Sequence, residues 1–143
     1  DPDYLSSPIG SGGTEKYPLC HYMEPYAEPV ATYKAGGSAE VKFSSLGATH
    51  NGGHCQFSLS YDNGVTFIAI HTIMNECPTL GGTLSIPIPS DAPAAEMAIF
   101  AWTWVNKTGN REFYMNCADV KIDGKVGGTL SGPEIVIANF PHG

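Results

Sequence analysis

The sequence has little charge, and most of that charge is acidic. Only 15% of its 143 residues are charged, and 14 acidic residues against 7 basic ones give a formal net charge of −7. Arg111 is its only arginine. Because binding to nucleic acid requires a basic face, we expect neither a nucleic-acid partner nor a phosphate site built from guanidinium groups.

Long apolar runs and helical periodicity are also missing. No run approaches the roughly 20 apolar residues that a membrane helix needs, so no membrane span is expected. No long stretch repeats apolar residues at helical spacing. The 17 glycines and 11 prolines instead favour short strands joined by turns. We expect one domain over residues 1–143, which the composition gives no reason to divide.

Several catalytic and metal motifs are absent. The sequence holds no G-x-S-x-G, no Walker phosphate loop, no H-E-x-x-H and no C-x-x-C, which argues against the corresponding hydrolases, nucleotide sites and zinc knuckles. An even number of well-separated cysteines predicts two disulfides and an oxidising compartment. These cysteines are Cys20, Cys55, Cys77 and Cys117.

Two further features favour secretion. The triplet Asn106-Lys107-Thr108 is an acceptor for N-glycosylation and predicts a glycan at Asn106. The chain begins at Asp1 rather than Met, without a charged and then apolar leader, so we interpret it as a processed or trimmed chain. We expect an extracellular, monomeric protein.

Alternating apolar and polar residues predict strands along most of the chain after residue 37. The first 37 residues, interrupted by five prolines, are predicted to be irregular. Pro87 and Pro89 lack an N–H, which makes 84–88 an edge strand, whereas 97–105 is apolar on both faces and reads as a central strand. The pattern predicts an all-β, antiparallel β-sandwich. The expected strands cover 39–44, 55–61, 65–74, 84–88, 97–105, 118–123 and 134–138.

A hairpin signal constrains the disulfides. Asp62-Asn63-Gly64 separates two strand-like runs, as in β-hairpins. Folding about Asn63 places residues in the low seventies opposite Cys55, which brings Cys77 close to Cys55. We therefore pair Cys55 with Cys77, and Cys20 then joins Cys117, which fastens the N-terminal segment to a late strand.

Two stretches carry side chains suited to chemistry. His50 lies among glycines and small residues just before a strand, where the backbone can approach a site closely. Glu112 and Tyr114 share one face of an extended segment, so they can serve one site. The alternatives are a surface histidine, and a core tyrosine beside a Glu112–Arg111 ion pair.

Ordered motifs between about residues 17 and 140 resemble the fungal chitin-active lytic polysaccharide monooxygenases. The resemblance implies an immunoglobulin-like or fibronectin III-like sandwich, secretion from a fungus, and chitin or another cell-wall polysaccharide as the partner. The motifs include A-T-H-N-G-G-H-C-Q (48–56), L-S-Y-D-N-G-V-T-F (59–67), I-P-S-D-A-P (88–93), F-A-W-T-W (100–104) and N-R-E-F-Y-M-N-C-A (110–118).

The resemblance also implies one copper ion in a histidine brace. In that family, an N-terminal histidine binds through its amino group and its imidazole, and a second histidine completes the brace. Matched to the motifs, His50 is the second histidine, Tyr114 the axial tyrosine, Glu112 the acid behind it, and Ala48 the small residue at the open axial position. Copper with dioxygen or peroxide then oxidises a C–H bond of a polysaccharide, with Tyr114 and Glu112 as catalytic residues.

The sequence departs from the family at residue 1, which is Asp rather than His. Imidazole suits copper, whereas a carboxylate suits harder ions. We therefore expect a metal set of Asp1, His50 and Tyr114, with weakened affinity for copper or another divalent ion and without ordinary polysaccharide oxidation. His54 or His21 are candidate substitutes for the missing imidazole.

Two other functions stay open from the sequence. One is an active monooxygenase with an unusual Asp/His brace. The other is a glycan-binding or structural module of the cell wall without a metal. Tyr4, Tyr22 and Tyr26 either stack on sugar rings or pack onto the sheet.

Overall fold

The computed structural model describes residues 19–22, 26–43, 49–78, 82–109 and 112–137. In this part of the chain, strands dominate and one short 3₁₀ helix precedes them. No helix among these residues is long and apolar enough to cross a membrane. The elements are η1 (Leu19–Tyr22), β1 (Ala31–Lys34), β2 (Ser38–Lys42), β3 (Gly53–Ser60), β4 (Ile68–Ile73), β5 (Thr83–Pro87), β6 (Ala95–Asn106) and β7 (Phe113–Asp123).

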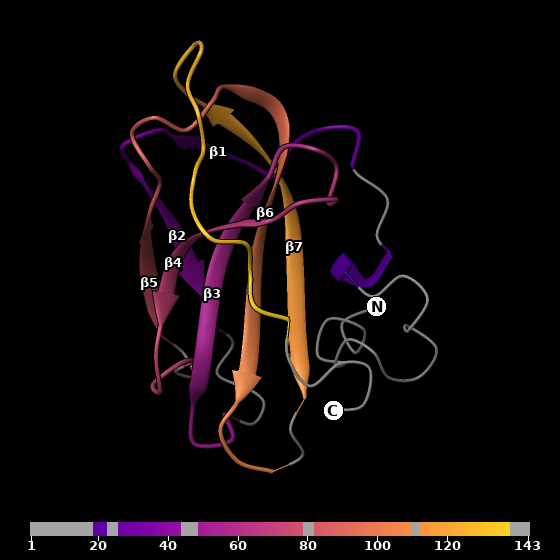
Figure 1. Ribbon diagram of the computed structural model, residues 1–143, viewed down its shortest axis with the longest axis vertical. Coiled ribbons are helices and arrows are strands. Elements are labelled where there is room, and N and C mark those ends of the chain that lie inside the picture. The colour runs from indigo at the N-terminus through magenta and orange to yellow at the C-terminus, as the bar shows by residue number, and fades with distance from the viewer. Residues whose placement is uncertain (1–18, 23–25, 44–48, 79–81, 110–111, 138–143) are drawn as a thin grey trace.

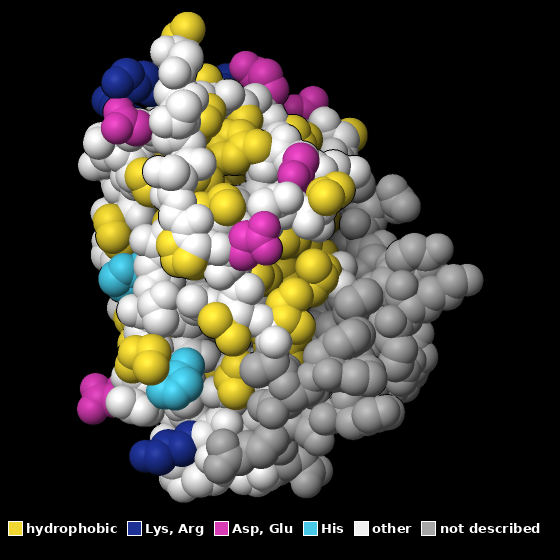
Figure 2. Space-filling model, viewed as in Figure 1, with side chains coloured by type: hydrophobic (Ala, Val, Ile, Leu, Met, Phe, Trp, Pro, Cys, Tyr) yellow, Lys and Arg dark blue, Asp and Glu magenta, His cyan; other side chains and the backbone are white. Residues whose placement is uncertain are grey.

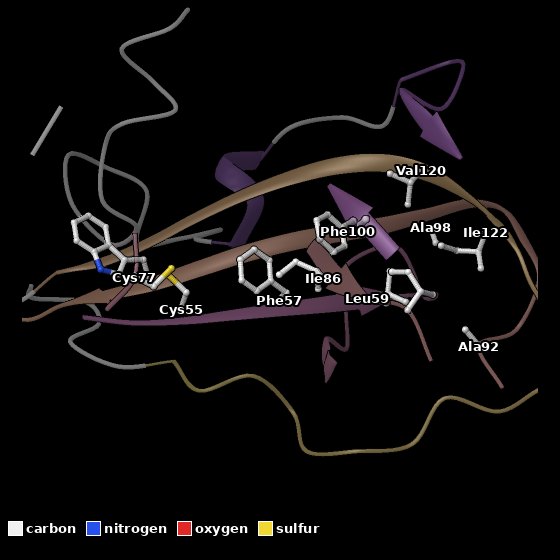
Figure 3. Packing of buried hydrophobic residues seen from close by; sticks show 13 residues of the cluster. Cys55, Phe57, Leu59, Cys77, Ile86, Ala92, Ala98, Phe100, Val120 and Ile122 are labelled. Atoms are coloured by element: carbon white, nitrogen blue, oxygen red, sulfur yellow. A yellow bond between two sulfur atoms is a disulfide. The ribbon is translucent and has the colours of Figure 1, made fainter. Parts of the chain in front are cut away.

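The strands form two sheets that pack as two layers (Figure 1). The larger sheet has the order β1-β7-β6-β3-β4, and β2 pairs with β5 in the smaller one. Phe57, Leu59 and Phe100 of the larger sheet share one buried cluster with Ala39 and Ile86 of the smaller sheet (Figure 3). The all-β fold and its layered packing confirm the coarse prediction from the sequence.

The prediction of a wholly antiparallel fold was wrong. β1 runs parallel to β7, with Ala31 opposite Val120 and Lys34 opposite Asp123. The same strand corrects the prediction that the first 37 residues are irregular. Ala31 and Tyr33 alternate with exposed Thr32 and Lys34, but four residues are too few to show a period of two against the surrounding prolines.

Two predictions for proline-rich and late segments had different outcomes. β5, which ends at Pro87, pairs with β2 at the edge of the small sheet, so the predicted edge strand is confirmed. The predicted strand 134–138 is wrong within the described residues, because Glu134 makes one isolated bridge to Ile68. The Ile135 N–H donates to the carbonyl of Phe67 at 3.1 Å, which fastens this segment beside β4.

Both faces of the larger sheet are covered near its middle. Phe67, Ala101, Phe113 and Met115 form a second buried cluster, against which Leu19, Cys20 and Ile135 pack. β6 lies between β3 and β7 in the sheet. This explains why 97–105 is apolar on both faces, and it confirms the predicted central strand.

Both predicted disulfides are present. Cys55 and Cys77 are bonded with 5.7 Å between their Cα atoms (Figure 3), and Cys55 lies opposite Ile73 in the antiparallel pair of β3 and β4. Cys20 is bonded to Cys117. The second bond holds η1 against β7.

The connection between β3 and β4 is longer than the tight turn that the sequence suggested. It runs over residues 61–67, and β4 begins at Ile68 rather than at 65. Asn63 and Gly64 have left-handed φ angles of 59° and 86°. The Asp62 carboxylate accepts the Thr66 N–H at 2.8 Å and the Ser60 hydroxyl at 2.9 Å. The Thr66 amide is the main cause that lowers the pKa of Asp62 below its ordinary value of 3.8.

Substitution of Asp62 should change the dependence of stability on pH. Because the pKa of Asp62 is lowered in the folded state, its contribution is present above 3.8 and is lost as the pH falls through the folded-state pKa. We expect Asp62→Ala to lower the free energy of unfolding at pH 7 and to flatten its decrease in acid. Urea unfolding between pH 2 and pH 7 measures both effects, with Asp62→Asn as the uncharged control. An unchanged pH profile in both variants would contradict this role.

Candidate metal centre

The described segments that carry His50, Glu112 and Tyr114 lie at one end of the larger sheet, at the bottom of the view in Figure 1. There β3 begins, β6 ends and β7 begins. Gly53 lies opposite Asn106, and Trp104 lies opposite Tyr114. The loop before β3 and the loop between β6 and β7 are therefore neighbours.

The loop that carries His50 has an unusual backbone. His50, Asn51 and Gly52 have left-handed φ angles of 47°, 59° and 89°. A Cβ on Gly52 would lie 2.5 Å from the carbonyl oxygen of Asn75, and one on Gly53 would lie 2.1 Å from that of Val105. Both glycines are thus required by close backbone contacts. The glycine-rich pattern in the sequence reflects this packing.

Trp104 brings the predicted imidazole and phenol to one place. Its ring centroid lies 5.8 Å from that of His50 and 4.9 Å from that of Tyr114. Trp104 is 5% exposed, so both rings lie against a buried aromatic surface. Its indole N–H is buried without a hydrogen-bond partner. The sequence placed Trp104 in a central strand but gave no sign of its role between the two rings.

Burial and Glu112 both favour the protonated form of Tyr114. The Tyr114 hydroxyl donates a hydrogen bond to Oε2 of Glu112. Burial, then this hydrogen bond and then the charge of Glu112 raise the pKa of Tyr114 well above its ordinary value of 10. Tyr114 is therefore a neutral phenol at physiological pH. The alternative partner of Glu112, Arg111, lies outside the described residues.

The structure argues against His54 as a substitute ligand. His54 is exposed on β3, and its Nδ1 accepts the N–H of Asn75 at 3.1 Å. A neutral imidazole that accepts at Nδ1 carries its proton on Nε2, so neither nitrogen offers a free lone pair. Several other candidates lie outside the described residues, or have side chains that do: Asp1, Tyr4, His21, Tyr22 and Ala48.

The donors present fit copper but do not complete a site. Among the described residues, no three His, Cys, Asp or Glu side chains gather as a metal cluster. His50 supplies an imidazole, the preferred protein ligand of copper, and Tyr114 supplies a neutral oxygen donor. A third donor has to come from elsewhere in the chain.

A polar depression of about 650 Å³ lies beside His50. It is lined by residues from three loops, which the pairing of β3 with β4 and with β6 and the Cys55–Cys77 bond hold near one another. The sequence marked the loop of Thr49, Asn51 and Gly52, but it missed Asn75, Glu76 and Pro78, because nothing in their local pattern marks them. The depression is lined by Thr49, Asn51, Gly52, Asn75, Glu76, Pro78 and Lys107.

The burial of Asn106 argues against the predicted glycan. Asn106 is 1% exposed. Its Nδ2, the atom to which a glycan would be attached, donates to the Thr108 carbonyl at 2.8 Å, and its Oδ1 accepts the Glu112 N–H at 2.8 Å. The side chain is a buried link within the loop, where no sugar fits.

Comparisons with known proteins identify relatives. No family model matches the sequence. The whole chain aligns at 43% identity over 150 residues with a protein named AA11 family lytic polysaccharide monooxygenase A, from Aspergillus fumigatus. Two further relatives of the same family, from A. fumigatus and A. oryzae, are 30% and 32% identical over 85% and 83% of the chain. The chain spans 66% of the length of the first relative and about a third of the other two.

A solved structure shares the fold. The crystal structure of a cellulose-active polysaccharide monooxygenase from M. thermophila matches with a TM-score of 0.64 and 17% identity, over 92% of this chain and 68% of that chain. The chain is thus a relative of the lytic polysaccharide monooxygenases, as its motifs predicted, and it has the fold of one of them.

The buried position of Asn106 predicts that the protein carries no glycan there. A glycan would require breaking the hydrogen bonds of its amide and removing the side chain from the loop. Peptide mass spectrometry of the protein secreted from a glycosylating eukaryotic host should recover the peptide with Asn106 unmodified. Substantial occupancy of Asn106 in folded protein would refute the structure of this loop.

Proposed function

We propose, from this kinship with lytic polysaccharide monooxygenases, that the protein is a secreted, monomeric, copper-binding protein directed at fungal cell-wall polysaccharide. His50 supplies the imidazole ligand. The observation that carries the proposal is the placement of His50 and Tyr114 on one buried tryptophan, from loops that are distant in the sequence. The two disulfides fit an oxidising, extracellular compartment.

Each residue has a separate task in this proposal. His50 offers a neutral nitrogen to the metal, and Trp104 limits where its ring can lie. Tyr114 presents a neutral oxygen, because Glu112 accepts its proton in a hydrogen bond. Copper bound there would supply the redox chemistry with which the family oxidises polysaccharide C–H bonds.

The identity of the third donor decides the activity. A chain that begins at Asp1 offers an α-amino group and a carboxylate where the family has an amine and an imidazole. A carboxylate is a harder ligand that favours copper(II) over copper(I). We therefore propose weakened copper binding and little ordinary polysaccharide oxidation for such a chain.

The polar depression beside His50 supports a polysaccharide partner. Its amide and hydroxyl groups, from Asn51, Asn75 and Thr49, can donate to and accept from sugar hydroxyls and the N-acetyl groups of chitin. Basic side chains do not gather into a patch on the described part of the face in Figure 2. A neutral glycan therefore fits this chain better than a polyanion.

A second candidate function is glycan binding without a metal. Tyr26 is 54% exposed, and its backbone N–H donates to Asp119 of β7 at 2.9 Å. This hydrogen bond holds the backbone of a residue whose exposed aromatic ring can stack on a sugar. The depression serves this function equally well.

Copper titration tests the proposed metal site. We expect the metal-free protein to bind one copper(II) ion and His50→Ala to lower the affinity by more than about 100-fold. Loss of a residue that only supports a ligand lowers metal affinity by up to about 100-fold, so loss of the ligand itself should cost more. His54→Ala is the matched control and should bind like the unsubstituted chain. Isothermal titration and EPR provide the measurement. Equal binding by the unsubstituted chain and His50→Ala would exclude the site.

Product analysis tests the role of residue 1. With a reductant and chitin, we expect the chain that begins at Asp1 to release few oxidised oligosaccharides, and Asp1→His with a free terminal amine to release more. Mass spectrometry detects the products, and Asp1→His combined with His50→Ala is the control. Two results together would support glycan binding without a metal. The chain with Asp1 and the Asp1→His variant would both be inactive, and metal-free His50→Ala would be retained on chitin like the unsubstituted chain.

A further inference from the structure

We infer that Thr108 and Gly109, in the loop between β6 and β7, are positioning residues for the imidazole of His50. Neither residue touches the proposed metal; both act through His50. As far as copper is concerned, the inference rests on the proposed function. The contacts that support it are contacts between protein groups.

Thr108 holds the backbone of His50 with two hydrogen bonds. The His50 carbonyl accepts the Thr108 hydroxyl at 2.7 Å and the Thr108 N–H at 3.1 Å. The side-chain amide of Asn51 donates through Nδ2 to the hydroxyl oxygen of Thr108 at 3.4 Å. His50 and Asn51 both have left-handed φ angles, a conformation that is unfavourable for L-residues. The bonds to Thr108 help to offset that cost at the residue that carries the imidazole.

Gly109 approaches the imidazole itself. A Cβ on Gly109 would lie 2.9 Å from Nδ1 of His50 and 3.3 Å from Cε1. Only a residue without a side chain leaves the ring where it is. Gly109 therefore bounds the ring at its Nδ1 edge, while Trp104 lies at a centroid distance of 5.8 Å.

The same loop connects His50 to the Tyr114 side of the site. Asn106 binds the Thr108 carbonyl through Nδ2 and the Glu112 N–H through Oδ1, both at 2.8 Å. Glu112 in turn accepts the Tyr114 hydroxyl. A chain of contacts thus runs from the His50 carbonyl through Thr108, Asn106 and Glu112 to the phenol. A displacement of Thr108 should affect both donors.

A pair of glycine variants separates ring displacement from backbone strain. Gly109 has φ of 87°, and Gly127 has φ of 70° with nothing within 4 Å of its added Cβ. Gly109→Ala and Gly127→Ala therefore carry a similar backbone cost, but only the first intrudes on His50. We expect Gly109→Ala to lower copper(II) affinity at least about tenfold and to alter the EPR spectrum, and Gly127→Ala to change neither. Similar affinities and spectra for the two variants would overturn the inference.

Substitutions at Thr108 test the hydroxyl. Thr108→Val keeps the shape and the N–H bond but loses the hydroxyl donor; Thr108→Ser restores it. We expect about tenfold weaker copper(II) binding and a changed EPR spectrum for Thr108→Val, with rescue by Thr108→Ser. Thr72→Val removes a hydroxyl that accepts from Gln56 at 3.3 Å on β4, and it is the control. Equal affinity and spectra for Val, Ser and the unsubstituted chain would overturn the role of Thr108.

A measurement on the metal-free protein separates this inference from the proposed function. In the unsubstituted chain, NMR should show a nuclear Overhauser contact between the Gly109 Hα atoms and the imidazole Hε1 of His50, weakened in Gly109→Ala and Thr108→Val. If the unsubstituted chain binds no copper, the proposed function fails, while these NMR changes still support positioning. Absence of the contact in the unsubstituted chain, or its persistence in both variants, refutes positioning whether or not copper binds.

Discussion

The candidate site depends on the register in which β6 pairs with its two neighbours. Gly53 opposite Asn106, and Trp104 opposite Tyr114, bring the ends of three strands to the same level. A slip by one residue would reverse which side chains face the interior, and Tyr114 would leave Trp104. The register itself is held by clusters on both faces of the sheet. The same strand register therefore determines both the packing of the core and the geometry of the site.

At the end of the sheet that carries the candidate site, contacts between two loops set the geometry. Left-handed residues, close glycines and backbone hydrogen bonds join the loop before β3 to the loop after β6. Trp104 is part of the main buried cluster and also the surface against which His50 and Tyr114 lie. The protein thus supports two potential donors with groups that also stabilise the fold. A neutral Tyr114 follows from its burial and from Glu112, without any contribution from a metal.

The sequence predicted elements wherever the pattern is local. The alternation in 55–61, the glycines around His50 and the hairpin signal at Asn63 led to β3, to the loop and to the Cys55–Cys77 bond. Prediction from the sequence failed where the conformation of a segment depends on residues far away in the chain. β1 is a strand because β7 lies beside it, and 134–138 is not a regular strand because the segment touches β4 at a single bridge. Asn106 fits an acceptor pattern, but its burial comes from contacts with Thr108 and Glu112, which no triplet reveals.

The parallel pairing of β1 with β7 bears on the order in which the molecule assembles. The partner of β1, like the partner of Cys20, lies in the last strand of the described chain. The ribosome synthesises β1 long before β7. β1 therefore lacks its sheet neighbour at a stage when the β3–β4 hairpin can already form. Contacts between such distant segments slow folding. Cys20 likewise lacks its partner until Cys117 is synthesised, 97 residues later.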